Sequence, residues 1–167
     1  MANLSVRDPG PNVMQGYLDR PDLTAKVVTD GWYCTGDIAR LDTEGFITIT
    51  GRESRFSKIG GEMVPHLSVE EAINVECGAA DGELLAVVTA VPDRAKGERL
   101  IVFHVPTAHA PKDVVRRLQE RGLPNLWIPG ADAFAEIPEL PMLGSGKLDL
   151  RRLAEMACER FAEARDA

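Results

Sequence analysis

Two nearly continuous apolar segments constrain the fold of this chain most strongly. Leu84–Val91 is broken only by Thr89, and Leu100–Val105 is rich in β-branched residues. Short apolar runs of this kind are typical of fully buried strands, whose successive side chains point to opposite faces of a sheet. We therefore expect both segments to be central strands, with a further short strand at Ala133–Ile137.

Three helices are expected to pack against these strands. Ser68–Glu71 has the pattern of a capping box, so a first helix is predicted to begin there and to end at Gly78. Pro111 favours the start of a second helix over Asp113–Arg121, which Gly122 closes. A third, amphipathic helix is predicted near the C-terminus, where apolar residues recur at helical spacing: Leu150, Leu153, Ala154, Ala157 and Phe161.

The first half of the chain is expected to be mostly β-structure. Ile38–Leu41 and Phe46–Thr50 have the pattern of strands, and the Asp-Thr-Glu-Gly sequence between them is typical of a hairpin turn. Arg55–Ile59 is predicted to be another short strand that leads into two glycines. Residues 1–30 contain several prolines and glycines, so we expect loops and short strands there, without a helix.

This order of elements predicts an α+β fold in two parts. Residues 53–167 would form a small C-terminal α+β domain, in which about three helices pack on a short mixed sheet. Residues 1–52 would be a β-rich fragment of a larger core domain, because a lone hairpin preceded by loops is marginally stable by itself.

Composition excludes several classes of function. The net charge of −7 and the pI of about 5.0 argue against nucleic acid as a main partner, because proteins that bind it usually carry a basic surface. Three cysteines and three histidines show no metal-binding spacing, so neither a metal site nor a disulfide framework is predicted. Scattered thiols fit a cytoplasmic location. No apolar run is long enough to span a membrane, and no signal peptide is visible.

A carboxylate and a guanidinium give the first chemical signal. Asp37 and Arg52 each follow a glycine, at the two ends of the predicted hairpin. Aspartate can accept hydrogen bonds from the two hydroxyls of a ribose, and arginine offers a planar set of donors to hydroxyls or phosphate. The neighbouring glycines allow a ligand to approach the backbone closely. Taken alone, Thr-Gly-Asp is also typical of an ordinary turn before a strand.

A lysine on a glycine-rich loop gives the second signal. Gly144, Ser145 and Gly146 precede Lys147, and a lysine on such a loop can be brought to a phosphate and withdrawn again. A Walker A loop is excluded, because that motif requires Gly at position 141 and Ser or Thr at 148, where this chain has proline and leucine. Taken alone, the segment is also consistent with a flexible surface lysine.

These segments together resemble the adenylate-forming enzymes, the superfamily of acyl-CoA synthetases, peptide-synthetase adenylation domains and luciferases. The resemblance rests on the order and spacing of the TGD hairpin, the Gly-Arg strand end and the LPMLGSGK loop, and on GPNVMQGYL at residues 10–18. RFSKIGGEMV at residues 55–64 and PMLGSGKLD at 141–149 look most like the synthetase part of bifunctional acyl-ACP synthetase/2-acylglycerophosphoethanolamine acyltransferases.

The resemblance implies an ATP-dependent reaction in two steps. A fatty acid would react with ATP and Mg²⁺ to give an acyl-adenylate, and the thiol of CoA or of the phosphopantetheine of acyl carrier protein would then displace AMP. Asp37 would hold the ribose hydroxyls, with Arg52 beside it. Lys147 would bridge the acyl carboxylate and the phosphate during adenylation, and Lys58 would face the site during thiol transfer.

The resemblance also implies a domain rotation. Gly60 and Gly61 would border the pantetheine arm, and the C-terminal domain would swing about Ser54, the residue two positions after the site arginine. Asp or Lys is usual at this hinge position, so Ser54 departs from the family pattern. Cys34 departs as well, since a basic residue is frequent there.

Three functions remain open from the sequence. The family's phosphate loop, acyl pocket and adenine-binding motif are not recognisable in residues 1–30, so we expect the chain to be inactive alone and to bind no nucleotide tightly. The resemblance thus implies that the chain is the C-terminal part of a synthetase, either an expressed fragment or a split gene product, and that residues 53–167 are its mobile lid domain. The chain would then work with a missing synthetase core in the cytoplasm, within a parent protein that other domains attach to the membrane. The alternatives are a non-catalytic module that docks a carrier protein or the core, and a small stand-alone enzyme that uses Lys147.

Overall fold

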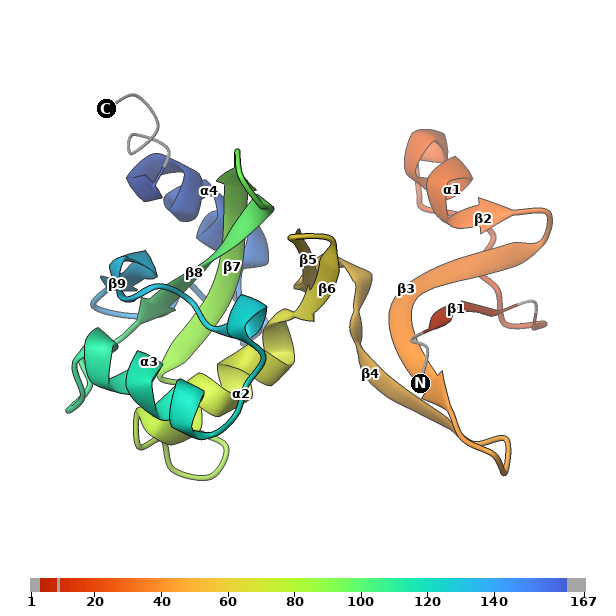
Figure 1. Cartoon of the computed structure of the whole chain (residues 1–167). Coiled ribbons are helices and arrows are strands. Elements are labelled where there is room, and N and C mark those ends of the chain that lie inside the picture. The colour runs from red at the N-terminus through yellow and green to blue at the C-terminus, as the bar shows by residue number, and fades with distance from the viewer. Residues whose placement is uncertain (1–3, 9, 162–167) are drawn as a thin grey trace. The chain divides into compact units, whose positions relative to one another are not determined.

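The computed structural model describes residues 4–8 and 10–161 and divides the chain into two compact units (Figure 1). Unit 1 is Met1–Arg55 and unit 2 is Phe56–Ala167. Each unit has its own sheet.

The sheet of unit 2 is built on a long antiparallel hairpin. Strand β7 (Ala86–Asp93) pairs with β8 (Gly97–His104) over its whole length. β8 also pairs in parallel with β9 (Phe134–Glu136) and, at one residue only, with β5 (Phe56–Ile59). β5 pairs in turn with β6 (Glu62–Pro65), a strand that the sequence analysis did not predict. The two apolar runs are therefore central strands, as predicted.

Helices cover both faces of this sheet. α2 (His66–Glu76) and α3 (Pro111–Glu120) pack on the face that includes Val88 and Val102, and α4 (Leu150–Phe161) packs on the opposite face (Figure 1). The two faces alternate along β7 and β8, so one core contains even-numbered residues of these strands and the other contains odd-numbered ones. Burial on both faces explains why these strands are apolar at nearly every position.

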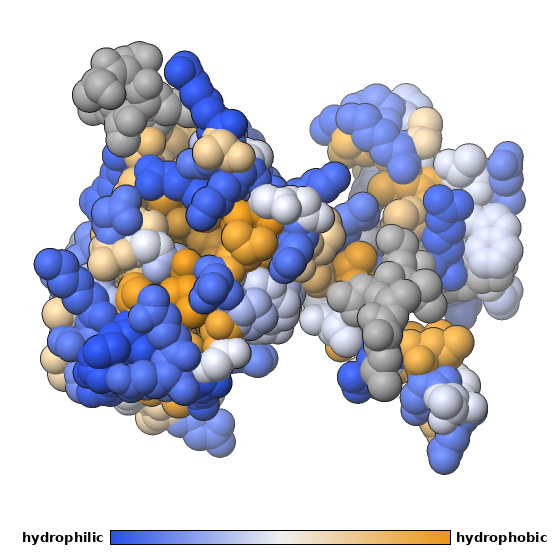
Figure 2. All heavy atoms as spheres, viewed as in Figure 1, coloured by the Kyte–Doolittle hydropathy of each residue, from blue (hydrophilic) through white to orange (hydrophobic). Residues whose placement is uncertain are grey.

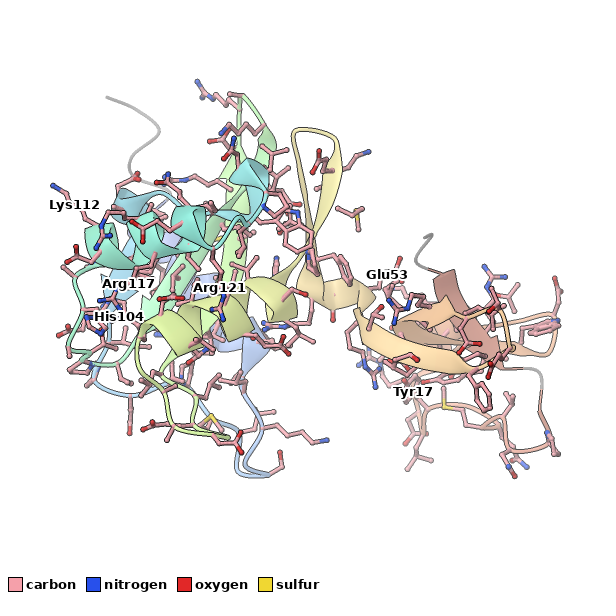
Figure 3. All side chains as sticks on the ribbon, turned by 60° about the horizontal axis from the view of Figure 1, so that its bottom comes forward. Tyr17, Glu53, His104, Lys112, Arg117 and Arg121 are labelled. Carbon is pink, nitrogen blue, oxygen red and sulfur yellow. The ribbon has the colours of Figure 1, made fainter. Side chains whose placement is uncertain are left out.

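The ends of α3 and α4 follow the sequence signals. α3 begins at Pro111, and both Gly78 after α2 and Gly122 after α3 have a φ of 80°, a left-handed conformation that glycine adopts without strain. Asp149 caps α4 by accepting a hydrogen bond from the backbone N–H of Arg152 at 2.9 Å. α3 is joined to α2 by an ion pair of 3.1 Å between Arg121 and Glu76 (Figure 3).

The capping box predicted at Ser68–Glu71 is wrong. α2 begins two residues earlier, at His66, directly after Pro65, and no side chain caps it. Glu70 is buried instead, and its carboxylate accepts a hydrogen bond of 2.7 Å from the backbone N–H of Val88 on β7. Ser68 and Glu71, the two residues that would form the box, are exposed and lie inside the helix, because α2 has already begun at His66. The charge-assisted bond to the sheet stabilises the buried carboxylate of Glu70 between them.

Unit 1 is a four-stranded antiparallel sheet around β3 (Trp32–Leu41). β3 pairs with β1 (Leu4–Asp8), β2 (Val28–Thr29) and β4 (Ile47–Arg52). The β3–β4 turn is closed by Asp42, whose carboxylate accepts the backbone N–H groups of Glu44 and Phe46, and Gly45 has a φ of 90°. The predicted hairpin is therefore confirmed. A 3₁₀ turn, Glu53–Arg55, ends the unit.

The prediction that residues 1–30 lack a helix is wrong. Pro21–Val27 forms the short helix α1. Pro21 occupies the first turn, where a missing N–H costs no helical hydrogen bond. The carboxylate of Asp22 binds the Arg20 guanidinium through two hydrogen bonds of 2.8 and 2.9 Å. A proline, which would interrupt a helix at an interior position, here lies at the first position of one.

The α+β fold class is confirmed: in the part of unit 2 that the structure describes, three helices pack on a short mixed sheet. Two short 3₁₀ turns, Asn125–Trp127 and Ala131–Ala133, connect α3 to β9. Apolar side chains also reach the surface of both units (Figure 2). Across residues 4–8 and 10–161, no helix has the length and apolar character needed to cross a membrane.

The buried face of α2 should dominate the stability of unit 2. Ile73 is fully buried, whereas Val75 on the same helix is 57% exposed. We expect Ile73→Ala to lower the free energy of unfolding by about 2–5 kcal/mol, because it leaves a cavity in the core. Val75→Ala is the matched control and should change it by less than about 0.5 kcal/mol. Denaturant unfolding followed by circular dichroism measures both; equal effects would contradict this packing.

Candidate functional site

The strand pairing of unit 1 brings Asp37 and Arg52 together. They are direct partners on β3 and β4, and the Arg52 guanidinium forms an ion pair of 2.7 Å with the Asp37 carboxylate. Arg52 also donates a hydrogen bond of 3.0 Å to the carbonyl of Thr35, whose hydroxyl accepts the backbone N–H of Asp37. These bonds hold the two charged groups in one orientation.

The pair is held at the surface rather than in the core. The side chain of Arg52 is 62% exposed and that of Asp37 is 20% exposed, so the guanidinium has further donors directed to solvent. A β-bulge at Ile38 shifts the register just beyond the pair, and Thr50 spans it with a hydrogen bond to the Ile38 carbonyl. The arrangement offers one acceptor group and one donor group side by side, which suits hydroxyl and phosphate recognition.

Two tyrosines near this pair were not singled out from the sequence. The pKa of the Tyr33 phenol is raised, first by a hydrogen bond to Tyr17 and then by the charge of Tyr17. The positive charge of Arg52 opposes this rise and the negative charge of Asp37 adds to it, so Tyr33 lies within electrostatic range of the ion pair. Tyr17 is 44% exposed (Figure 3). Tyr17 falls in residues 10–18, which carry part of the family resemblance, and Tyr33 lies two residues before the Thr-Gly-Asp segment; these positions are the signal that could have identified them.

Lys58, Gly60 and Gly61 lie on one hairpin of unit 2. Lys58 is exposed on β5 between the buried residues Ser57 and Ile59. Gly60 and Gly61 are the two-residue turn to β6, with φ values of 58° and 91°. Two successive positive φ values are typical of the tight turns that match the twist of a hairpin, and glycine adopts them most easily. The sequence thus places Lys58 two residues before the first glycine of a turn of fixed shape.

Lys147 lies on an exposed loop that is more ordered than its glycine content suggests. Met142 and Leu148 form an isolated antiparallel bridge across the loop. The carbonyl of Lys147 accepts the backbone N–H of Leu143 at 2.7 Å, and Gly146 donates to the Leu143 carbonyl at 2.9 Å with a φ of 77°. Lys147 therefore lies at the base of a small closed loop, beside the bridge, and its side chain is exposed.

The candidate residues fall into separate groups in the part of the chain that the structure describes. Asp37 and Arg52 belong to unit 1, and Lys58 and Lys147 to unit 2. Ser54 is exposed in the 3₁₀ turn that ends unit 1. Within residues 4–8 and 10–161, no group of three His, Cys, Asp or Glu side chains could hold a metal ion.

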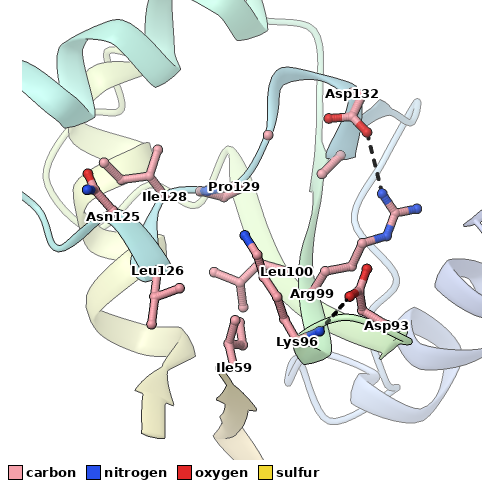
Figure 4. A pocket seen from close by; sticks show the side chains of 12 residues that line it. Ile59, Asp93, Lys96, Arg99, Leu100, Asn125, Leu126, Ile128, Pro129 and Asp132 are labelled. Atoms are coloured by element: carbon pink, nitrogen blue, oxygen red, sulfur yellow. Dashed lines mark hydrogen bonds and ion pairs between the residues drawn. The ribbon is translucent and has the colours of Figure 1, made fainter. Parts of the chain in front are cut away.

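A pocket of about 180 Å³ lies within unit 2, beside the turn between β5 and β6 (Figure 4). A Cβ placed on Gly60 would lie 3.4 Å from Leu126, which lines the pocket together with Ile59. Lys96 and Arg99 bring positive charge to its wall, but Arg99 pairs with Asp132 at 3.4 Å. The pocket therefore has mixed charge and indicates no single class of ligand.

The raised pKa of Tyr33 can be tested directly, because Tyr17 and Tyr33 are the two tyrosines of the sequence. We expect Tyr17→Phe to lower the pKa of Tyr33 toward the ordinary value, since the hydrogen bond that raises it is lost. Titration of the phenolate absorbance measures this shift, and Tyr33→Phe isolates the titration of Tyr17. An unchanged Tyr33 titration in Tyr17→Phe would show that the two hydroxyls are not bonded.

Comparison with known proteins gives related enzymes over most of the chain. The chain is 35% identical over 155 residues to 2,3-dihydroxybenzoate-AMP ligase of Bacillus subtilis, and 32% identical over 165 residues to medium-chain fatty-acid–CoA ligase of Escherichia coli. Each match includes 91% of this chain and 28% of the relative, so the chain spans little more than a quarter of these enzymes. No protein-family model matches the chain.

Solved structures agree with these relatives. o-Succinylbenzoate CoA synthetase of Bacillus subtilis, in complex with its acyl-adenylate intermediate, matches 91% of this chain and 30% of that chain, with a TM-score of 0.76 and 27% identity. The same enzyme with ATP and magnesium ion matches with a TM-score of 0.75 and 28% identity. In both comparisons the chain aligns with the C-terminal part of longer enzymes. Over the length that these comparisons cover, the chain belongs to the superfamily of adenylate-forming acyl-CoA and acid–CoA ligases.

Proposed function

We propose that this chain is the C-terminal region of an ATP-dependent acid–thiol ligase. Residues 1–52 would complete one wall of a nucleotide site in a larger core, and residues 53–167 would be the mobile domain. The single observation that carries the proposal is the Asp37–Arg52 ion pair, fixed by the β3–β4 register in a chain whose relatives are ligases of this kind.

The nucleotide would be held by the pair on β3 and β4. The Asp37 carboxylate has an acceptor oxygen beyond its ion pair for the ribose hydroxyls of ATP, and Arg52 has further donors for hydroxyl or phosphate oxygens. Mg²⁺ would enter with the ATP phosphates and be held by them and by the core, since the described residues supply no ligand cluster. We expect no tight nucleotide binding to this chain alone.

Two lysines would act in successive steps. During adenylation, negative charge gathers where the acyl carboxylate attacks the α-phosphate, and the ammonium of Lys147 would stabilise that charge in a dry site. During thioester formation, Lys58 would face the site while the turn of Gly60 and Gly61 leaves room for a pantetheine arm. Ser54 would be the hinge between the two poses, because an exposed turn between compact units can absorb a backbone change.

The acid substrate that we propose is a fatty acid, and the acceptor is the phosphopantetheine of acyl carrier protein or of CoA. Support for the acid comes from the fatty-acid–CoA ligase among the relatives, and support for the carrier protein comes from residues 55–64 and 141–149. We further propose that the parent is a bifunctional acyl-ACP synthetase and acyltransferase of lysophospholipid reacylation, cytoplasmic and attached to the membrane through other domains. Comparing holo-carrier protein with CoA as acceptor in the complete enzyme tests this assignment.

Exposed apolar residues on unit 1 support a larger partner domain. Leu41, Phe46, Ile47 and Ile49 of the β3–β4 hairpin are each more than half exposed. Apolar side chains that gather on one hairpin usually mark an interaction surface. We assign this surface to the synthetase core, which would bury it.

Separate assays of the two half-reactions test the lysine roles in the ligase formed by this chain and its upstream core. We expect Lys147→Ala to lower ATP–pyrophosphate exchange by about 100-fold or more and to spare thioester formation from preformed acyl-adenylate. Lys58→Ala should have the opposite pattern. Lys112→Ala, on the exposed side of α3 (Figure 3), is the matched control and should leave both reactions unchanged. Equal loss of both half-reactions in either variant contradicts the assignment.

The nucleotide role of Asp37 has its own test in the same ligase. We expect Asp37→Asn to raise the KM for ATP in pyrophosphate exchange by about 10- to 100-fold, because a charge-assisted hydrogen bond to the ribose is weakened. Asp42→Asn, in the turn of the same hairpin, is the control for a carboxylate that binds backbone N–H groups only. An unchanged KM for ATP would leave Asp37 with a purely structural role.

A further inference from the structure

Strand pairing attaches β5, the strand that carries Lys58, only weakly to β8. β5 joins β8 through a single register pair, Ile59 and Gly97. One pair leaves the backbone N–H groups on either side of it to find other partners. The position of β5 against β8 therefore depends on the groups that bind the backbone N–H groups of Lys58 and Gly60.

A side chain binds the first of these groups. The carboxylate of Glu98 accepts the backbone N–H of Lys58 at 2.6 Å, although the two residues are 40 positions apart in the sequence. The carbonyl of Lys96 accepts the N–H of Gly60 at 2.8 Å. Glu98 thus supplies a charge-assisted bond at the position where a longer ladder would have placed a carbonyl.

The opposite side of β5 is held by burial. Ser57 and Ile59 are both nearly fully buried, and the Ser57 hydroxyl shares a hydrogen bond of 2.7 Å with Nε2 of His66 at the start of α2. The neighbours of Lys58 are therefore anchored in the core, and its own side chain points outward. On one side β5 is paired with β6, where Lys58 is opposite Met63, and on the side of β8 the carboxylate of Glu98 holds the backbone N–H of Lys58.

The turn between β7 and β8, which precedes Glu98, is also held by hydrogen bonds. The Asp93 carboxylate accepts hydrogen bonds from the backbone N–H groups of Lys96 and Ala95, both at 2.9 Å (Figure 4). These bonds lower the pKa of Asp93, and the bond from Lys96 has the largest effect. Gly97 has a φ of 85°, and a Cβ there would lie 3.2 Å from the carbonyl of Lys58. The turn between β7 and β8 can therefore approach β5 closely and in one conformation.

We propose that Glu98 is a positioning residue for thioester formation, holding Lys58 and the Gly60–Gly61 turn in place. This inference rests on the role of Lys58 in the proposed function. Without the carboxylate, the N–H of Lys58 exchanges its fixed partner for water, and β5 loosens from β8. A small displacement of a group that must meet a reacting atom lowers the rate of that step. Adenylation, which uses the loop of Lys147, does not depend on this contact.

The two half-reactions of the complete ligase test the inference. We expect Glu98→Ala to lower thioester formation from preformed acyl-adenylate by about tenfold and to leave ATP–pyrophosphate exchange unchanged. Glu98→Gln keeps a neutral acceptor and should recover part of the rate. The control is Glu83→Ala, since Glu83 is an exposed glutamate that likewise accepts a backbone N–H, that of Ala80 at 2.9 Å; both its half-reactions should be unchanged.

Amide hydrogen exchange on the 167-residue chain gives a readout that does not depend on activity. The amide of Lys58 should exchange faster in Glu98→Ala than in the unmodified chain, and at an unchanged rate in Glu83→Ala. Unchanged exchange at Lys58, or equal loss of both half-reactions, would overturn the role of Glu98. If the unmodified ligase performs neither half-reaction, the proposed function is wrong, whereas the exchange result still reports the contact.

Discussion

The burial of β7 and β8 on both faces is the constraint on which unit 2 depends. Since neither face of this hairpin can be left in water, α2 and α3 must cover one side and α4 the other. The sites of interest lie at the margins of this packed centre. Lys58 is on a strand joined to the start of β8, and the loop of Lys147 leads directly into α4. The rigid core thus carries both lysines on short extensions.

The chemistry is divided between the two units in a way that follows from their local structure. A strand ladder fixes Asp37 and Arg52 as neighbours, which gives them little freedom beyond side-chain rotation. Lys58 and Lys147 instead lie on a hairpin strand and at the base of a closed loop, where both side chains are exposed. A static pair for nucleotide recognition and exposed cations for charge stabilisation fit the two-step chemistry that we propose for the parent ligase.

Sequence reasoning failed where a local pattern competed with a distant contact or had two meanings. Ser68–Glu71 has the spacing of a capping box, but α2 begins at the buried His66, so Ser68 lies inside the helix, and Glu70 within the pattern binds the backbone of Val88 across the core. The prolines and glycines of residues 1–30 favour loops, although Pro21 lies in the first turn of a helix, where a proline has no bond to lose. One error misplaces the start of a helix and the other misses a helix, and neither changes the predicted order of the central strands.

The sequence by itself determined the central strands, the β3–β4 hairpin, the glycines after α2 and α3, and the residue types of the candidate site. These features depend on local periodicity and backbone conformation, which neighbouring residues encode. Only the tertiary structure decided that Tyr17 lies near enough to raise the pKa of Tyr33 and that Glu98 holds the backbone N–H of Lys58. These contacts join residues far apart in the chain, and they exist because burial of the sheet and pairing of β3 bring separate segments together. A local sequence pattern does not show which distant segments of the chain come into contact. The packing of the folded chain decides it.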